Sequence, residues 1–98
     1  MEIRGSDLIE DFCKKHANAV DPVTRWLDVV EAAQWKHHNE LKADFPTADY
    51  VGKGRYVFNI KGNNYRLIAV VVFIKGRITI RYIGTHAEYD KIKNIEKT

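Results

Sequence analysis

The amino-acid sequence predicts an α+β domain in which N-terminal helices pack on one face of a small, twisted antiparallel sheet. Apolar residues recur at helical spacing in the first half of the chain. The second half alternates apolar and polar residues between glycine-containing turns. A short helical segment is expected after the last strand. At 98 residues the chain is interpreted as a single domain, residues 1–98, with one modest core.

Three amphipathic helices are expected in the first half. Each start has a capping side chain or a proline suited to the first helical position: Ser6, the pair Asp21-Pro22, and Asn39. The helices are expected to end near residue 18, near residue 34 and before the proline at position 46. Their large aromatic residues are assigned to the core or to packing on the sheet: Trp26, Trp35 and Phe45.

The following segment, PTADYVGKGR (46–55), is interpreted as a loop with Lys53 at its tip. Three strands are then expected from Tyr56 onward, joined by turns at Gly62-Asn63 and Lys75-Gly76. If both turns are two-residue hairpins, the numbers of paired residues add up to 125 across the first and 151 across the second.

Alternation along these strands assigns the side chains to two faces. The face expected to pack on the helices contains Phe58, Ile60, Tyr65, Leu67, Ala69, Val71, Phe73, Ile78, Ile80 and Tyr82. The opposite face contains Val57, Asn59, Lys61, Arg66, Ile68, Val70, Val72, Thr79, Arg81, Ile83 and Thr85. In this register Arg66 lies opposite Thr85, Arg81 lies opposite Val70, and His86 leaves the last strand beside Arg66.

Charge is distributed unevenly along the chain. Residues 1–49 contain six Lys/Arg against ten Asp/Glu, a net charge of −4, whereas residues 50–98 contain ten against three, a net charge of +7. Between positions 51 and 86 all seven charged residues are cations. Focused positive potential favours a phosphate-bearing partner. The alternative is that some of these cations are solvated at sheet edges, where they discourage aggregation.

Several features limit location and metal binding. The apolar run from Leu67 to Ile74 is too short for a membrane span, and the first residues lack the pattern of a signal peptide. A single cysteine, Cys13, fits a reducing compartment, so the cytoplasm is expected. Cys13 and His16 share a helix face, but zinc needs further ligands, which favours core packing. His37 and His38 point apart and are expected to be exposed.

Two arginines on a partly apolar sheet face require anions. An ion pair with Glu88, Asp90 or a helix carboxylate would satisfy them, and so would a phosphate bound by their planar forks. His86 can carry a proton at neutral pH. Together with the arginines it matches in-line RNA self-cleavage, in which a base takes the 2′-OH proton, cations stabilise the phosphate and an acid protonates the 5′-oxygen. This chemistry needs no metal or cofactor.

Two segments carry a resemblance to a known family. VFNIKGNNYRLI (57–68) and RYIGTHAEYDKI (81–92) closely resemble HigB-type toxins of the RelE superfamily, and WKHHNELKADFPTADYVGKGRYVF is similar to that family's linker into the sheet. The resemblance covers about residues 26–92. It implies a RelE-like fold whose concave face holds mRNA in the ribosomal A site, and a ribosome-dependent mRNA endoribonuclease of a bacterial type II toxin–antitoxin system.

The resemblance also implies site residues and partners. It makes Arg66 the strand arginine, His86 the proton-transfer residue, and Tyr89 an aromatic that stacks on a base or assists acid catalysis. With the face assignment, the candidate catalytic residues are Arg66, Arg81, His86 and Tyr89, and the candidate RNA-binding residues are Lys53, Arg55, Lys61, Asn63 and Asn64. The implied partners are mRNA, the ribosome and a HigA-type antitoxin with a helix-turn-helix domain, so DNA would be contacted only through the antitoxin.

Two alternatives remain. A toxin with a RelE-like fold that acts on DNA gyrase would lack this catalytic set, so the GTHAEY segment argues against it. A non-catalytic RNA- or ribosome-binding module would use Tyr56, Tyr65 and the cations, since aromatic-rich sheets bind single strands by stacking. Most of these aromatics are assigned to the helix-packed face, which disfavours the second alternative.

Overall fold

A computed structural model describes residues 1–98, apart from the side chain of Glu96. The helices are α1 (Ser6–Lys15), α2 (Val20–Ala32), α3 (His38–Asp44) and α4 (His86–Asp90), with 3-10 turns at Ala17–Ala19, Phe73–Lys75 and Ile95–Lys97. The strands are β1 (Glu2–Arg4), β2 (Asp49–Gly52), β3 (Arg55–Ile60), β4 (Tyr65–Val72) and β5 (Arg77–Thr85). They form one sheet in the order β1-β5-β4-β3-β2. The predicted α+β architecture is confirmed.

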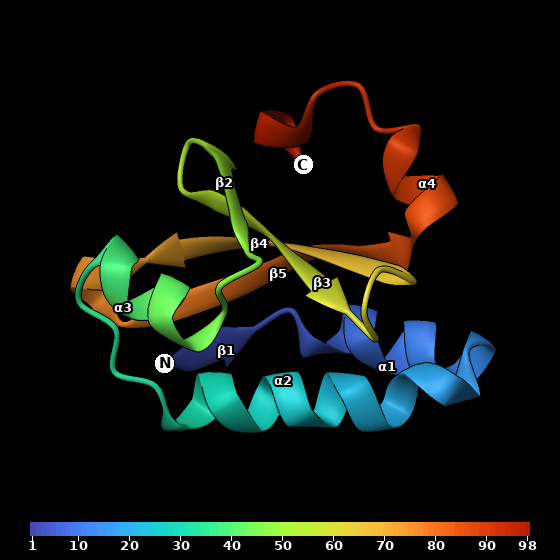
Figure 1. Ribbon diagram of the computed structural model, residues 1–98, viewed down its shortest axis with the longest axis horizontal. Coiled ribbons are helices and arrows are strands. Elements are labelled where there is room, and N and C mark those ends of the chain that lie inside the picture. The colour runs from blue at the N-terminus through green and yellow to red at the C-terminus, as the bar shows by residue number, and fades with distance from the viewer.

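The sheet separates two layers of unequal size. Helices α1 and α2 lie on one side of it, and α4 with the C-terminal segment lies on the other (Figure 1). The core fills the space between the sheet and α1 and α2, and its largest fully buried side chains include Phe58, Leu41 and Leu67. Trp26 and Trp35 are buried in this core and Phe45 packs against it, as predicted.

Two strands lie where the sequence predicted none. β1 pairs in parallel with β5, so the sheet is mixed rather than antiparallel. This strand has only three residues, too few to show an alternating pattern. β2 lies inside the segment interpreted as a loop and pairs antiparallel with β3 through a turn at Lys53, whose φ is 50°. The glycines around Lys53 form a hairpin turn rather than an open loop.

The helix starts differ from the predicted caps by one or two residues. Helix α1 begins at Ser6 itself, and its N-cap is Gly5 with φ 84°. A 3-10 turn precedes α2, so Asp21 and Pro22 lie in its first turn instead of forming its boundary. Helix α3 begins at His38 rather than after Asn39, and Glu40 accepts the N–H of His37 at 3.1 Å.

The first hairpin has the predicted register, with Asn59 opposite Arg66. The predicted register of the second hairpin is wrong. Its connection is longer than Lys75-Gly76, because Phe73–Lys75 form a 3-10 turn that ends at Gly76 with φ 61°. A further irregularity in the pairing lies between Ile68 and Ala69 of β4. Arg66 therefore lies opposite Gly84 instead of Thr85, and Val70 opposite Thr79 instead of Arg81.

The irregularity also moves the side chains of Tyr82, Ile83 and Thr85 to the other face of β5. Ile80 pairs with Ala69 and Tyr82 with Ile68, so Arg81 is the extra residue of a bulge. Beyond the bulge Ile83 packs against the core, although it was predicted on the opposite face. Tyr82, predicted on the helix-packed face, instead shares the face of Ile68. The bulge therefore adds a tyrosine to the face that carries Arg66.

Candidate active site

The candidate site forms where the β3–β4 turn meets the junction of β5 and α4. The main-chain N–H of His86 donates to the carbonyl oxygen of Asn64 at 3.0 Å. This bond joins the first residue of α4 to the turn that precedes β4. Five of the predicted site residues therefore gather here: Asn63, Asn64, Arg66, His86 and Tyr89.

Arg66 is held by two neighbours. Its Nη2 donates to Oδ1 of Asn63 at 2.8 Å, and its guanidinium carbon lies 4.9 Å from the centroid of the Tyr89 ring. Its Nε is buried and has no hydrogen-bond partner among the described residues. Buried donors are normally paired, so this unpaired Nε is an exception among the described residues. The contacts with Asn63 and Tyr89 orient the guanidinium before any anion is bound.

The ion-pair alternative is not what the structure shows. Neither Arg66 nor Arg81 forms an ion pair with a described carboxylate. Asp90 instead lies beside His86, and Glu88 takes part in a cap. Among the described residues, no carboxylate side chain therefore neutralises the charge of either arginine.

His86 is oriented by a cap and by a carboxylate. Thr85 Oγ1 accepts the N–H of Glu88 at 3.2 Å, and Glu88 Oε1 accepts the N–H of Thr85 at 2.8 Å, which fixes the start of α4. His86 Nδ1 lies 3.0 Å from Oδ2 of Asp90, one turn later. A carboxylate at Nδ1 orients the ring and leaves Nε2 for proton transfer. With 40% of its side chain exposed, His86 is open to a ligand.

The same cap shifts the ionisation of Glu88. Hydrogen bonds from the main chain and side chain of Thr85 hold the pKa of Glu88 below its ordinary value. Glu88 is therefore an anion at neutral pH that serves the cap. Asp90 was not expected from the sequence as the partner of His86. Its spacing of four residues on a helix was the signal that would have identified it.

Tyr82 is a further residue that the sequence analysis placed elsewhere. A side chain at position 84 would overlap the Tyr82 hydroxyl, so Gly84 provides the room in which the Tyr82 ring lies. Gly84 is also the residue paired with Arg66. Burial raises the pKa of the Tyr82 phenol, and the nearby charge of Glu88 adds to this effect. Tyr82 is thus a protonated phenol beside the strand position of Arg66.

Arg81 and Arg55 form a separate cluster. The Nε of each donates to the main-chain oxygen of Thr98 at 3.2 Å, and Nη1 of Arg55 also donates to the carbonyl oxygen of Lys53 at 3.0 Å. The predicted pair of Arg66 and Arg81 is therefore divided between two places on one face.

Lys61 lies in the β3–β4 turn with φ 52° and not within a strand. Its side chain lines a cavity of about 240 Å³ beside α2, together with Arg25 and Trp26. The prediction that Lys61 shares the strand face with Arg66 and Arg81 is wrong, because the turn spans Lys61 to Asn64.

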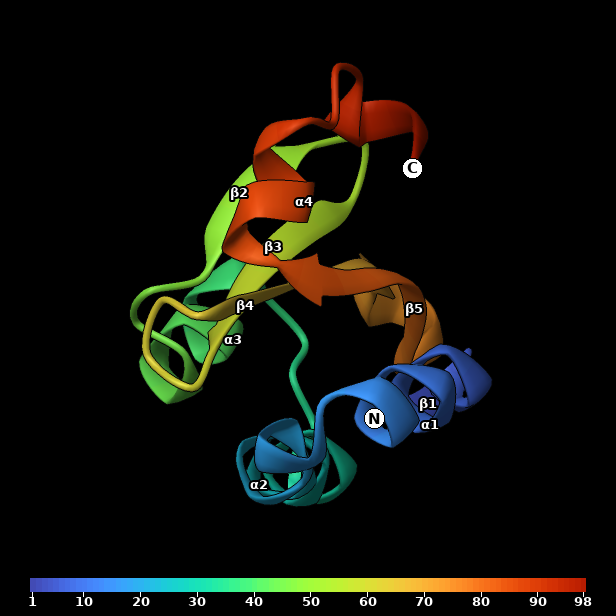
Figure 2. The ribbon, with the colours of Figure 1, turned by 90° about the vertical axis from the view of Figure 1, so that its right-hand side faces the viewer.

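The face that carries these arginines is covered in this structure. Val57 and Ile68 are 2% and 0% exposed, yet they lie outside the core beneath α1 and α2. Helix α4 contacts β4 and β5, and the 3-10 turn at Ile95–Lys97 contacts β2, so the chain from α4 to Thr98 lies on this side of the sheet, away from α1 and α2 (Figure 2). The C-terminal segment therefore occupies the surface that the sequence analysis assigned to RNA.

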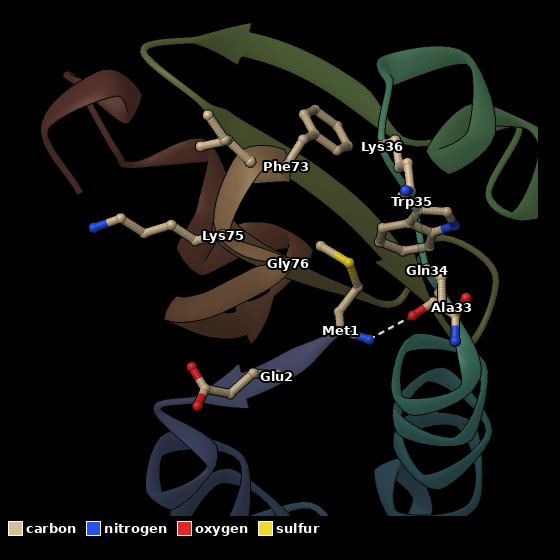
Figure 3. Close-up of a pocket in the computed structure, with 10 residues that line it drawn as sticks. Met1, Glu2, Ala33, Gln34, Trp35, Lys36, Phe73, Lys75 and Gly76 are labelled. Carbon is tan, nitrogen blue, oxygen red and sulfur yellow. Dashed lines mark hydrogen bonds between the residues drawn. The ribbon is translucent and has the colours of Figure 1, made fainter.

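Two larger cavities lie away from the site. One, of about 440 Å³, lies where Met1 meets the end of α2 and the β4–β5 turn, and the Met1 amino group donates to the carbonyl oxygen of Ala33 there (Figure 3). The other, of about 510 Å³, is lined by aromatic rings, including those of His38 and Tyr56. His38 is exposed as expected, but its Nδ1 lies 2.7 Å from the Tyr56 hydroxyl. Neither cavity contains a predicted site residue.

The remaining predicted features concern metals and membranes. Cys13 packs against the core and the ring of His16 stacks on Phe12 with 4.3 Å between centroids, which agrees with core packing. In the part of the chain that the structure describes, no three His, Cys, Asp or Glu side chains gather as a metal site. None of the described helices is long and apolar enough to cross a membrane.

Comparison with known proteins identifies relatives over most of the chain. Residues 19–92 match the HigB toxin family, described as the RelE-like toxic component of a toxin–antitoxin system. The mRNA interferase HigB of Escherichia coli O6:H1 is 30% identical over 95 residues, covering 94% of this chain and 91% of that protein. The mRNA interferase HigB of Shigella flexneri is 31% identical over 93 residues, which cover 92% of this chain and 88% of that protein.

Proposed function

Because this chain belongs to the HigB toxin family, we propose that it is an endoribonuclease that cleaves mRNA in the ribosomal A site. The observation that carries this proposal is the grouping of Arg66, His86 and Tyr89 around the β3–β4 turn, with Arg66 unpaired by any described carboxylate. The related proteins from E. coli O6:H1 and S. flexneri are named mRNA interferases, which supports the same activity for this chain.

The proposed reaction is an in-line transfer within the RNA. The 2′-oxygen attacks the adjacent phosphorus and loses its proton, the bond from phosphorus to the 5′-oxygen breaks, and that oxygen gains a proton. The products are a 2′,3′-cyclic phosphate and a free 5′-hydroxyl. His86 transfers one of the two protons, and Asp90 keeps its ring oriented. Arg66 stabilises the extra negative charge on the phosphate in the transition state.

Aromatic side chains have supporting roles in this proposal. Tyr89 lies against the Arg66 guanidinium, from which it can stack on a neighbouring base. Tyr82, protonated and close to Gly84, is a second hydroxyl near the scissile position. Asn63 positions Arg66, and Asn64 anchors the start of α4.

The family is the toxic component of a toxin–antitoxin system, so an antitoxin is the partner of this chain. We propose that it is a HigA-type protein with a helix-turn-helix domain and that this chain meets DNA only through it. The translating ribosome is the proposed place of action, which puts the protein in the cytoplasm.

A non-catalytic RNA-binding module is less well supported. It would stack bases on Tyr56 and Tyr65, but these side chains are 2% and 7% exposed. Tyr65 packs against Phe12 and Tyr56 against His38, so neither ring offers a free face for a base. The exposed His86 and the oriented Arg66 fit a reaction on phosphate better.

The test is cleavage of a translated mRNA on ribosomes by the wild type, His86→Ala and the matched control His37→Ala. His37 is also an exposed histidine at a helix start, but it is remote in sequence from the site. Loss of the proton-transfer group should slow cleavage by about 10²–10⁴-fold. Binding to ribosomes and to the antitoxin should remain unchanged, and the control should cleave normally. Full cleavage by His86→Ala would refute the assignment.

A further inference from the structure

Arg55 and Arg81 come from the two strands that flank β4 and converge on one atom. The Nε of each donates to the main-chain oxygen of Thr98 at 3.2 Å. Both guanidinium groups therefore direct a donor edge to the same point on the face opposite α1 and α2. Two planar forks that share one acceptor oxygen are arranged as they would be around an oxygen of a phosphate group.

This cluster is distinct from the position of Arg66. Arg55 lies opposite Val70 and Asn59 lies opposite Arg66, so the two arginine rows are four residues apart on β4. At about 3.3 Å per residue, the rows are separated by about 13 Å. Asn63 and Tyr89 hold Arg66 at its own end of the strand. One phosphate cannot occupy both positions.

The cluster has donors but no anion among the described side chains. Arg55 and Arg81 form no ion pair with a described carboxylate, and the hydrogen bonds of their guanidinium groups end on main-chain oxygens of Lys53 and Thr98. Charge-assisted hydrogen bonds to an anionic oxygen are about twice as strong as hydrogen bonds between neutral groups. A phosphate would give both guanidinium groups such a bond at the point where they converge.

We propose that Arg55 and Arg81 together bind one backbone phosphate of the RNA, at the position that the main-chain oxygen of Thr98 occupies in this structure. RNA and residues 91–98 then exclude each other from this face of the sheet. The inference rests on the proposed function, because that function makes RNA the polyanion that reaches this surface. It adds a second phosphate site, about 13 Å along β4 from the scissile one.

Displacement of the segment would also uncover the floor of the site. Val57 and Ile68 are buried on this face and lie outside the core beneath α1 and α2. These two side chains lie between the row of Arg66 and the row of Arg55, along which bases and ribose rings of the bound RNA would pass. Bound RNA would then take the place of residues 91–98 on this face of the sheet.

The first test measures how salt weakens the binding of a short 2′-O-methyl oligonucleotide, which cannot be cleaved, to the whole chain. Each phosphate contact on a single strand contributes about 0.7 to the slope of log K against log salt. Arg55→Gln combined with Arg81→Gln should lower this slope by about 0.7, since both arginines hold one phosphate. A decrease of about 1.4 would show two separate phosphates and overturn the proposal.

Arg77→Gln is the matched control. Arg77 is a cation on β5 like Arg81, but its Nε lies 2.7 Å from the Glu2 carboxylate, so it is already paired. Its replacement removes the same charge without touching the proposed site. An equal loss of slope in this variant and in the double variant would show a general effect of net charge, which would also overturn the proposal.

The second test follows the wild-type chain by NMR and does not depend on the variants folding. Titration with the same oligonucleotide should shift the Nε–H signals of Arg55 and Arg81 together with the main-chain N–H signal of Thr98. All three should give one dissociation constant. Arginine signals that respond while the Thr98 signal stays unchanged would show that residues 91–98 do not compete with RNA.

These readouts separate this inference from the proposed function. Both tests measure binding of an RNA that cannot react, whereas His86→Ala tests cleavage. If His86→Ala abolishes cleavage but Thr98 does not respond to RNA, the second phosphate site fails and the endoribonuclease assignment stands. If Thr98 and both arginines respond but His86→Ala cleaves normally, the second phosphate site stands and the catalytic assignment of His86 fails.

Discussion

Replacement of Gly5 by alanine should destabilise the protein strongly. Gly5 has φ 84°, a left-handed conformation that costs an alanine about 1–2 kcal/mol. An added Cβ would also lie 2.5 Å from the carbonyl oxygen of Ile80 and 3.3 Å from its main-chain carbon and nitrogen. Ile80 belongs to β5, whose main chain cannot yield as a flexible side chain would. Strain from such an overlap adds about 1–3 kcal/mol.

The expected total for Gly5→Ala is therefore about 2–5 kcal/mol, a large part of the roughly 5–15 kcal/mol that stabilise a typical domain. Gly76→Ala is the matched control, because Gly76 has φ 61° but its Cβ would meet nothing within 4 Å. Only the conformational cost of about 1–2 kcal/mol applies there. Urea denaturation of both variants and the wild type measures the difference between the two positions.

Equal destabilisation of the two variants would refute this reasoning. It would mean that the contact with Ile80 is relieved at no cost and that Gly5 matters only for its conformation. The predicted overlap also has a functional consequence, because Ile80 immediately precedes the bulge at Arg81. Any shift of β5 at this point should reach the residues that follow it.

Three further variants test the site and its support. Thr85→Ala removes the N-cap oxygen of α4, so it should cost about 1 kcal/mol in denaturation experiments and should also reduce cleavage by loosening His86. Glu88→Gln tests pH dependence: because the folded pKa of Glu88 is lowered, its contribution is present above the ordinary value of 4.5 and is lost as the pH falls through the folded value. At pH 7 the free energy of unfolding of the wild type should therefore exceed that of this variant, by less than about 1 kcal/mol because Glu88 is so exposed. The difference should vanish in acid, and a difference that stays constant with pH would contradict this prediction. Tyr56→Phe removes a buried hydroxyl that meets His38 and should cost about 1 kcal/mol in urea denaturation, and an unchanged midpoint would show that the bond contributes nothing.

The sequence predicted those parts of the fold that depend on local patterns. Helical spacing placed Trp26 in the core. The glycine and asparagines after Lys61 gave the correct register of the first hairpin. In both cases the pattern and the structure involve neighbouring residues, so one sequence carries enough information.

The errors occurred where distant contacts decide the structure. The apolar residues Phe73 and Ile74 look like strand residues, yet they form a 3-10 turn that shifts the second hairpin. No glycine or proline at Arg81 indicates the bulge in the sequence. The bulge alone places Tyr82 and Ile83 on the faces opposite to those predicted.

For the candidate site, local motifs brought Arg66, His86 and Tyr89 to attention, and the structure places them around one turn. The partner of Arg81 could not be predicted, because Thr98 reaches it only through the path of the C-terminal segment. A contact of this kind has no periodicity or turn signal in the sequence.

The parallel pairing of β1 with β5 has a consequence for when the candidate site forms during folding. Glu2 and Arg4 pair with Arg77 and Thr79, so β1 cannot pair until β5 has been synthesised. Pairings this distant in sequence are slow to form. Strand β5 also leads directly into His86, so sheet closure and completion of the candidate site occur at the same late stage. A chain in which β5 has not yet paired would therefore lack a completed candidate site.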